Sequence, residues 1–213
     1  METNWDTQYK NMWDERYQKQ GFAYGKAPNV FFKEWLSKFN PGSLLMPADG
    51  EGRNGVFAAE LGWQVTAFDL SKEGKTKALQ LAAEQGVKLD YLVGDFAELE
   101  FAPASFDAIG LIYAHFAPEK KAAFHQRLSE CLKPGGIIIL EAFGKNHLEY
   151  RQQNPKVGGP GIAEMLYSEE EIRADFKDYE MIKLTEEEVT LNEGRHHNGK
   201  GSVVRFVGRK PVN

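Results

Sequence analysis

Apolar and polar positions alternate in blocks along residues 44–143. Amphipathic stretches separate five short apolar runs, which lie at 44–46, 65–69, 89–96, 106–113 and 137–141. Apolar runs of this length predict buried strands, and the stretches between them predict helices. Such an alternation is typical of a parallel sheet covered by helices on both faces. We therefore expect an α/β fold with a doubly wound, mostly parallel sheet.

Glycine and proline mark the ends of the predicted helices. Helices over 56–61 and 75–85 are each followed by a glycine, which favours the left-handed turn that ends a helix. A helix over 118–132 begins with a proline, whose fixed φ suits the first helical turn.

The pattern changes after the fifth apolar run. Residues 145–167 contain the run Gly-Gly-Pro-Gly and predict an irregular insertion. A capping box at 168–171 then opens a short helix. Residues 179–191 and 202–209 predict two strands joined by a loop over 192–201, an antiparallel pair that closes one edge of the sheet.

The turn after the first apolar run has the sequence Met46-Pro47-Ala48-Asp49-Gly50-Glu51-Gly52. Gly50 and Gly52 leave no Cβ between the backbone and a ligand, and they allow turn conformations that other residues resist. Pro47 has no amide hydrogen to donate, so we expect the strand to end at Met46. A glycine-rich turn between a strand and a helix is how a βαβ unit holds an adenosine-containing cofactor.

The acidic residues of this unit narrow the kind of cofactor. Asp69, at the carboxyl end of the second strand, offers two coplanar oxygens to the hydroxyls of a ribose. The turn lacks the Gly-Lys-Ser/Thr ending of a P-loop, and Asp49 and Glu51 would repel a phosphate. We therefore expect a cofactor that contains adenosine, lacks phosphates and carries positive charge.

These residues resemble the class I methyltransferases, whose cofactor S-adenosyl-L-methionine has that chemistry. The usual pattern of the family is acidic-x-Gly-x-Gly-x-Gly, and this chain departs from it at Met46 and Ala48. We hypothesise that Asp49 supplies the missing carboxylate to the α-ammonium group of the cofactor. The resemblance implies a Rossmann-like sheet of seven strands that ends in a C-terminal antiparallel hairpin.

Three later motifs follow the order and spacing of the same family. Gly94-Asp95-Phe96 is similar to the corner that binds adenine, where an acidic residue accepts a hydrogen bond from the exocyclic amine. The strand that ends near Tyr113 resembles the one beside the transferring methyl group. Leu132-Lys133-Pro134-Gly135-Gly136 looks like the turn into the fifth strand of the family.

The two ends of the chain resemble one branch of this family. The aromatic-rich residues 13–29, the turn 51–54 and the tail 192–200 are similar to the tellurite-resistance and thiopurine-methyltransferase-like enzymes. This resemblance implies a small-molecule methyl acceptor, such as a thiol or a chalcogen oxyanion, and an N-terminal segment that covers the cofactor. Packing on the domain is the alternative role of the N-terminal aromatic side chains.

We expect a single methyltransferase domain over residues 1–213, because no linker or repeat divides the chain. Within it we expect an N-terminal lid or cap over 1–40 and a cofactor-binding core over 41–143. Residues 144–213 are expected to supply the insertion and the C-terminal hairpin.

The predicted sites combine residues of the lid with residues that follow the strands. The predicted cofactor-binding residues are Trp13, Tyr24, Ala48, Asp49, Gly50, Gly52, Arg53, Asn54, Asp69, Leu70, Ser71, Asp95, Phe96 and Tyr113. His115, Arg195 and His197 are predicted to line the substrate. Arg53 is a candidate clamp for a carboxylate or another anion, with a surface salt bridge as its alternative role.

His115 is the candidate catalytic base. Methyl transfer from a sulfonium is an in-line displacement, in which positioning of the reactants supplies about 7–11 kcal/mol. A base is needed only when the nucleophile arrives protonated. His115 follows the fourth strand, where the ligand crevice of a parallel sheet lies. A structural or substrate-lining role is the alternative.

The tail Arg195-His196-His197 is a second candidate for the substrate side, where an arginine suits an anionic acceptor. Neighbouring histidines point to opposite faces of a strand, and in a loop these two lack further ligands, so we expect no metal site. A solvated hairpin tip is the alternative for this tail.

The amino-acid composition limits the kinds of binding partner and the location that we expect. The formal net charge of −5 argues against a nucleic-acid-binding surface. Cys131 is the single cysteine, which excludes an internal disulfide, and we expect it to be a buried structural thiol. The N-terminus does not resemble a signal peptide, and no apolar run approaches the length of a membrane span. We therefore expect a soluble, cytoplasmic protein.

Two other functions compete with methyl transfer. A module that binds or senses S-adenosylmethionine without catalysis is motivated by Met46 and Ala48 in the signature turn. A nicotinamide-dependent reductase shares the first βαβ unit, but it explains neither the motif at 94–96 nor the terminal hairpin. The methyl acceptor and the oligomeric state stay open, because one fold hosts many functions.

Overall fold

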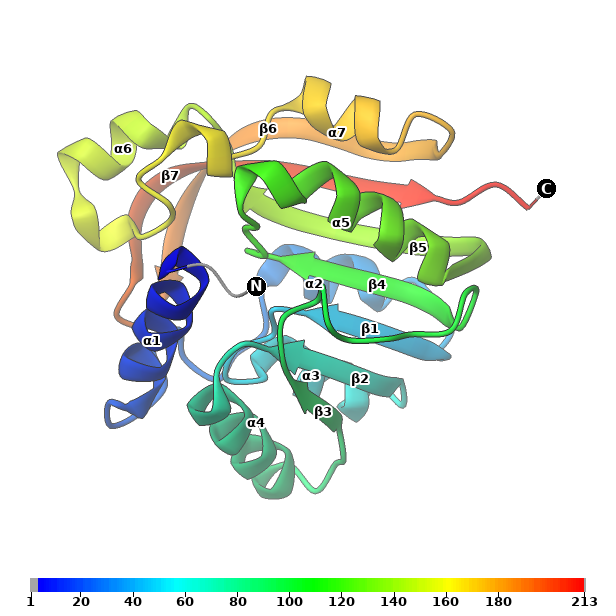
Figure 1. Cartoon of the computed structure of the whole chain (residues 1–213), viewed down its shortest axis with the longest axis horizontal. Coiled ribbons are helices and arrows are strands. Elements are labelled where there is room, and N and C mark those ends of the chain that lie inside the picture. Colours follow the sequence, from blue (N-terminus) through cyan, green and yellow to red (C-terminus); the bar gives the residue numbers. More distant parts are fainter. Residues whose placement is uncertain (1–3, 213) are drawn as a thin grey trace.

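The computed structural model describes residues 4–212, with side chains from residue 7 onward. Its sheet has the order β3-β2-β1-β4-β5-β7-β6 (Figure 1). The strands of this part of the chain are β1 (Ser43–Pro47), β2 (Gln64–Asp69), β3 (Asp90–Val93), β4 (Phe106–Ile112), β5 (Leu132–Phe143), β6 (Glu180–Glu193) and β7 (His197–Arg209). The first five strands are parallel, whereas β7 is antiparallel to both β5 and β6. The predicted seven-stranded, mostly parallel sheet with a terminal hairpin is confirmed.

Helices cover both faces of this sheet. The helices within residues 4–212 are α1 (Asn4–Gln18), α2 (Val30–Leu36), α3 (Arg53–Glu60), α4 (Lys72–Glu84), α5 (Pro118–Cys131), α6 (His147–Gln153) and α7 (Glu169–Asp175). Side chains of α2, α3 and α4 share one apolar cluster, and those of α5 and α7 share another. Strand β1 shows why, because Leu44 and Met46 belong to the first cluster and Leu45 to the second. Successive side chains of a strand point to opposite faces, so a sheet covered on both faces has continuously apolar strands.

Local signals end the helices as the sequence predicts. Gly62 and Gly86 follow α3 and α4 with φ values of +92° and +70°. Ser168 and Glu171 form the predicted capping box at the start of α7. Ser71 accepts a hydrogen bond from the Gly74 amide and caps α4.

Pro47 belongs to β1, so the prediction that the strand ends at Met46 is wrong. Pro47 pairs with Phe68 of β2, whereas β4 pairs with β1 only at Leu44 and Leu45. The missing amide hydrogen therefore lies beyond the part of the strand that bonds on both sides, where a proline is tolerated.

The turn expected at 132–136 lies inside β5, which begins at Leu132. Gly135 has a φ of +76°, and the register between β4 and β5 shifts between Phe106 and Ala108. The chain therefore makes an irregular turn without losing its place beside β4.

The insertion and the hairpin loop also differ from expectation. Residues 145–167 contain α6 and two short 3₁₀ turns, η1 (Pro155–Val157) and η2 (Ala163–Met165), so this segment is partly helical. The hairpin pairs as far as Glu193 with His197, which leaves a turn of three residues in place of the expected loop. Polar side chains produced the expectation of a loop, but strand pairing uses backbone groups and is compatible with a polar face.

Cys131 is free and buried, as predicted. Within residues 4–212, no helix combines the length and the apolar character needed to cross a membrane.

Phe206 of β7 provides a test of the packing. Its side chain is fully buried and stacks on Phe176 with ring centroids 5.1 Å apart. Phe206→Ala is expected to lower the free energy of unfolding by about 3–5 kcal/mol, because it leaves a cavity in the core. Chemical denaturation measures this change. Val30→Ala is the control, because Val30 is 75% exposed and its truncation should change stability by less than about 0.5 kcal/mol. Equal effects would contradict this assignment of the core.

Candidate active site

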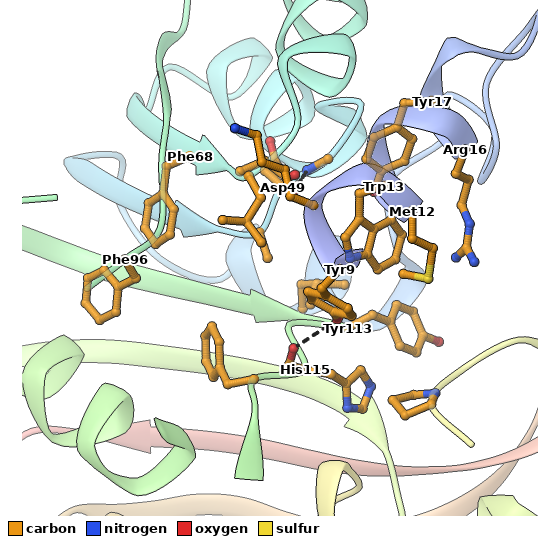
Figure 2. A pocket seen from close by; sticks show the side chains of 18 of the residues that line it. Tyr9, Met12, Trp13, Arg16, Tyr17, Asp49, Phe68, Phe96, Tyr113 and His115 are labelled. Carbon is orange, nitrogen blue, oxygen red and sulfur yellow. Dashed lines mark hydrogen bonds between the residues drawn. The ribbon is translucent and has the colours of Figure 1, made fainter. Parts of the chain in front are cut away.

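A cavity of about 990 Å³ lies at the carboxyl ends of the parallel strands (Figure 2). Residues that follow β1, β2, β3 and β4 form its floor, and α1 forms one wall. Small-molecule sites usually measure about 300–1,000 Å³, so this cavity has room for two ligands side by side.

The glycines of the first turn lie close against two neighbouring helices. Gly50 and Gly52 have φ values of +56° and +84°, so the expected turn conformations are present. A Cβ on Gly50, however, would lie 2.5 Å from the Tyr17 hydroxyl, and one on Gly52 would lie 2.6 Å from Cβ of Ala78. The space that these glycines leave open is therefore filled by α1 and α4, and Gly52 does not line the cavity.

Two buried carboxylates face the cavity at this turn. Asp69 accepts hydrogen bonds from the amides of Gly50, at 3.0 Å, and Ser71, at 2.9 Å. Burial raises the pKa of Asp69 to about 6, although these amide hydrogen bonds oppose the rise. Asp49 accepts from the Gly55 amide at 3.2 Å, and burial raises its pKa well above the usual range. This end of the cavity therefore suits a cationic ligand.

An aromatic corner follows β3. Phe96 stacks on Phe68 with ring centroids 5.3 Å apart, and Figure 2 shows the two rings together on one side of the cavity. Asp95 accepts from the Ala97 amide at 2.9 Å and pairs with Lys120 at 3.2 Å. The corner thus combines flat apolar faces with a carboxylate, a combination that suits a planar heterocycle.

Helix α1 contributes a row of side chains to the opposite wall (Figure 2). Tyr9 contacts Trp13 edge to face, and Trp13 stacks on Tyr17 with centroids 5.4 Å apart. The Tyr9 hydroxyl donates to the His115 carbonyl at 3.4 Å, which ties α1 to the loop after β4. Arg16 donates to the Tyr24 hydroxyl at 2.6 Å. No carboxylate of the described residues pairs with Arg16.

Aromatic rings surround His197 at the end of the cavity near β4 and β5. Its imidazole lies 4.5 Å from the rings of both Tyr24 and Tyr113, and 5.2 Å from that of Phe143. Tyr113 has a φ of +53°, an uncommon value for a residue with a large side chain, and its hydroxyl donates to Glu141 at 2.9 Å.

Both ring nitrogens of His115 bind backbone groups. Nδ1 donates to the Met165 carbonyl at 3.0 Å, and Nε2 accepts from the Phe143 amide at 3.4 Å. Burial lowers the pKa of His115 to about 3. The residue therefore lines the cavity as a neutral ring.

Most of the predicted site residues meet in this cavity. The predicted residues that line it are Trp13, Tyr24, Ala48, Asp49, Gly50, Arg53, Asn54, Asp69, Leu70, Asp95, Phe96, Tyr113, His115 and His197. Ser71 does not line it, because its hydroxyl is buried in the cap of α4. Arg195 does not line it either, because its guanidinium donates to the Gln20 carbonyl on the outside of the hairpin.

The structure also contradicts two of the alternative roles, the surface salt bridge of Arg53 and the solvated hairpin tip. Arg53 does not form a surface salt bridge: its guanidinium is buried and pairs with Glu193 at 3.0 Å. His197 is not part of a solvated hairpin tip, because only 4% of it is exposed. Both corrections have one cause, since β6 and β7 pair further than expected and bring the end of the hairpin against the sheet.

Sequence reasoning missed Glu141 and Glu193 as residues of this region. Glu193 pairs across the hairpin with His197, and that spacing would have been a signal if the turn had been placed correctly. Nothing in the local sequence marks Glu141, which is the last polar residue of an apolar strand.

Comparisons with known proteins agree with this geometry. Residues 45–136 match the family described as "Methyltransferase domain". An uncharacterized protein of Mycobacterium tuberculosis is 36% identical over 96 residues, which are 45% of this chain and 35% of that protein. The ubiquinone biosynthesis O-methyltransferase of Idiomarina loihiensis is 30% identical over 128 residues, which are 59% of this chain and 49% of that protein. The chain thus spans about a third to a half of the length of these relatives.

Solved structures share the fold over nearly the whole chain. A structure from work on the conversion of a disulfide bond into a thioacetal group during echinomycin biosynthesis has a TM-score of 0.76 at 16% identity. The alignment covers 96% of this chain and 93% of that one. TehB from Haemophilus influenzae has a TM-score of 0.68 at 15% identity, covering 94% of this chain and 66% of that one. At such identities the likeness concerns the fold, and it does not select a branch of the family.

Over residues 45–136 the chain is similar to the methyltransferase domain family. The strand order of its sheet and the position of its cavity fit the class I S-adenosylmethionine-dependent methyltransferases that its sequence motifs resemble.

The close packing of Tyr17 against Gly50 predicts that a larger residue at position 50 loosens α1. Gly50→Ala would force the Tyr17 ring away from the turn, and overpacking of this kind typically costs about 1–3 kcal/mol. Hydrogen exchange of α1 amides should therefore accelerate roughly tenfold or more. Gly86→Ala is the matched control, because Gly86 also has a positive φ but no atom lies within 4 Å of its added Cβ. Unchanged protection of α1 in Gly50→Ala would show that Tyr17 does not anchor the helix.

Proposed function

We propose that this protein transfers the methyl group of S-adenosylmethionine to a small-molecule nucleophile inside the cavity. The observation that carries the proposal is the division of the cavity into two unlike ends. Buried carboxylates and a stacked aromatic corner lie at one end, and an aromatic cage with arginines nearby lies at the other. Such a division suits a cationic cofactor beside a second, uncharged or anionic ligand.

The residues of the first end fit the cofactor. Asp69 would accept hydrogen bonds from the ribose hydroxyls, because each of its oxygens keeps a lone pair beyond its backbone bond. Asp95 and Phe96 would hold the adenine, and Asp49 would face the α-ammonium group. Asp49 and Asp69 would repel phosphates at this turn, which disfavours the nicotinamide-dependent reductase.

The protein's contribution to the reaction is mainly positional. The bound cofactor supplies a methyl group already activated by its sulfonium. Tyr113 lies at the end of β4 between the two halves of the cavity, and its hydrogen bond to Glu141 holds its ring in place. Alignment of two bound reactants supplies about 7–11 kcal/mol, so this chain needs to add little acid–base chemistry.

The position of helix α1 argues for a small acceptor. Tyr9, Met12, Trp13 and Arg16 line the cavity from its outer side, which favours a small substrate over a macromolecular one. The acceptor would enter and leave as α1 moves, as lids do in other enzymes. A thiol, a chalcogen oxyanion or a similar nucleophile fits the branch that the chain ends resemble.

His115 is a poor base for this reaction. Its Nε2 accepts a backbone hydrogen bond, and its pKa of about 3 makes it a weak proton acceptor. We propose that it lines the acceptor end, stacked on Phe143 with centroids 5.8 Å apart.

Binding and turnover test the function separately. Calorimetry should show binding of S-adenosylhomocysteine and none of NADH. Mass spectrometry should then detect methylated product from a panel of thiols, phenols, selenite and small heteroaromatics with S-adenosylmethionine. Binding without transfer to any member of the panel would favour the non-catalytic binding module, and binding of NADH alone would favour the reductase.

The titration of Asp69 should make the affinity for S-adenosylhomocysteine depend on pH. Ligand hydroxyls need its carboxylate form, whose pKa in the free protein is about 6. Affinity for S-adenosylhomocysteine should therefore be constant above pH 6 and fall as the pH drops below it. Asp69→Asn should weaken binding by roughly 1–3 kcal/mol and flatten this profile.

Asp90→Asn is the control for this measurement, because Asp90 is an exposed carboxylate of β3 outside the cavity. Calorimetric titrations across the pH range compare the three proteins. Unchanged affinity in Asp69→Asn would remove Asp69 from the site.

A further inference from the structure

The five histidines of the chain differ in how their ring nitrogens are bonded. His115, His125 and His147 are held at both nitrogens by backbone or side-chain partners. His196 lies on the hairpin turn and does not line the cavity. His197 is buried, lines the cavity and bonds through one nitrogen only.

The bonded nitrogen of His197 faces a carboxylate. Its Nδ1 lies 2.9 Å from Oε2 of Glu193, and none of the described residues lies within hydrogen-bond distance of Nε2. In the described part of the chain, Trp63 Nε1 is the single fully buried side-chain nitrogen or oxygen without a hydrogen-bond partner. Nε2 of His197 also has no partner, so it is not fully buried, although the residue as a whole is 96% covered. Because His197 lines the cavity, we take Nε2 to be reached from there.

The surroundings fix this arrangement. Glu193 also accepts a hydrogen bond from Arg53 at 3.0 Å, so the carboxylate is held from two sides. Burial opposes its ionisation, but the hydrogen bond from His197 and the charge of Arg53 lower the pKa of Glu193 to about 2. A carboxylate on Nδ1 keeps the proton on that nitrogen and leaves Nε2 with a free lone pair.

We infer that His197, held by Glu193, is a general base at the acceptor end. In this role Nε2 of His197 takes the proton of an acceptor hydroxyl. This inference rests on the proposed methyl transfer. The hydroxyl oxygen forms a bond to the methyl carbon, and the bond from that carbon to sulfur breaks with its electrons on sulfur. The hydroxyl proton passes to Nε2, and the imidazolium is stabilised by Glu193.

The acceptor class follows from this chemistry. An oxyanion such as selenite is already ionised and gains nothing from a base, whereas a phenol has a pKa of about 10 and does. The rings of Tyr24, Tyr113 and Phe143 around His197 provide flat faces for a planar molecule. The geometry therefore favours a phenolic or similar hydroxyl on a flat small molecule.

The charges around His197 set the expected pH dependence. Glu193 of β6, Arg53 of α3 and Arg16 of α1 face it, and burial lowers its pKa despite the hydrogen bond to Glu193. His115, beside β5, and His147, of α6, face it as neutral rings, and Tyr24 and Tyr113 contact it. His197 is therefore neutral at pH 7. The rate of methyl transfer to a phenol should be flat near neutral pH and fall in acid, as the base becomes protonated.

NMR tests the arrangement without turnover. Ring-nitrogen spectra of the wild-type protein, assigned with His197→Gln, should show His197 neutral at pH 7 with its proton on Nδ1. Glu193→Gln should weaken that tautomer preference. A proton on Nε2, or a charged ring at pH 7, would overturn the inference whatever the protein binds.

Kinetics with a series of ring-substituted phenols test the role. His197→Gln should retain S-adenosylhomocysteine binding and lose roughly 10²–10⁴-fold in transfer to phenols that are protonated at the assay pH. It should lose little with nitrophenols that are already ionised. His196→Gln is the matched control, a neighbouring histidine outside the cavity, and should transfer at the wild-type rate.

The outcomes separate the two proposals. An equal loss with ionised and protonated phenols would mean that His197 only shapes the cavity, and would overturn the inference. Transfer by the wild-type protein to selenite or thiolates but to no phenol would overturn it as well, and would leave the proposed function intact. Absence of S-adenosylhomocysteine binding would reject the proposed function itself.

Discussion

Two carboxylates, the buried Glu141 and the largely covered Glu193, impose the constraint on which the rest of the site depends. A buried carboxylate is costly unless charges and hydrogen bonds compensate it. Glu141 accepts from Arg205 at 2.7 Å, Asn29 at 2.6 Å and Tyr113 at 2.9 Å. These contacts join the end of β5 to β7, to the start of α2 and to the residue after β4.

Glu193 extends the same constraint to the hairpin. It binds Arg53 of α3 and His197 of β7, and Asn29 donates to it at 3.4 Å. Asn29 thus contacts both carboxylates and also caps α2 through its side-chain oxygen. Removal of one partner would leave a charge buried without compensation, so these residues hold one another in a single arrangement. The aromatic cage around His197 is a consequence of this arrangement.

A second set of contacts holds the N-terminal segment beside the cavity. Glu51 accepts from the Ala23 amide at 2.6 Å and pairs with Lys77 at 2.9 Å, which ties the segment to the first turn and to α4. The Arg195 amide donates to the Ala23 carbonyl at 2.9 Å, which ties it to the hairpin. Residues more than 170 positions apart in the chain therefore form one wall. Tyr24 and Gly25 of the same segment line the cavity, so these contacts fix part of its wall.

The sequence by itself determined the sheet, the helices on its two faces and most of the residues that meet in the cavity at the carboxyl ends of the strands. Those features depend on local patterns: apolar runs, helix-ending glycines, the capping box at Ser168 and acidic residues directly after strands. Only the tertiary structure decided the proposed acceptor end, where Glu193 meets Arg53 and His197, and where Glu141 meets Arg205 and Tyr113. Such contacts follow from how strands pair and how far a hairpin extends. Backbone pairing also accommodates polar side chains, so the polar end of this hairpin gave no local sign of how far the strands extend.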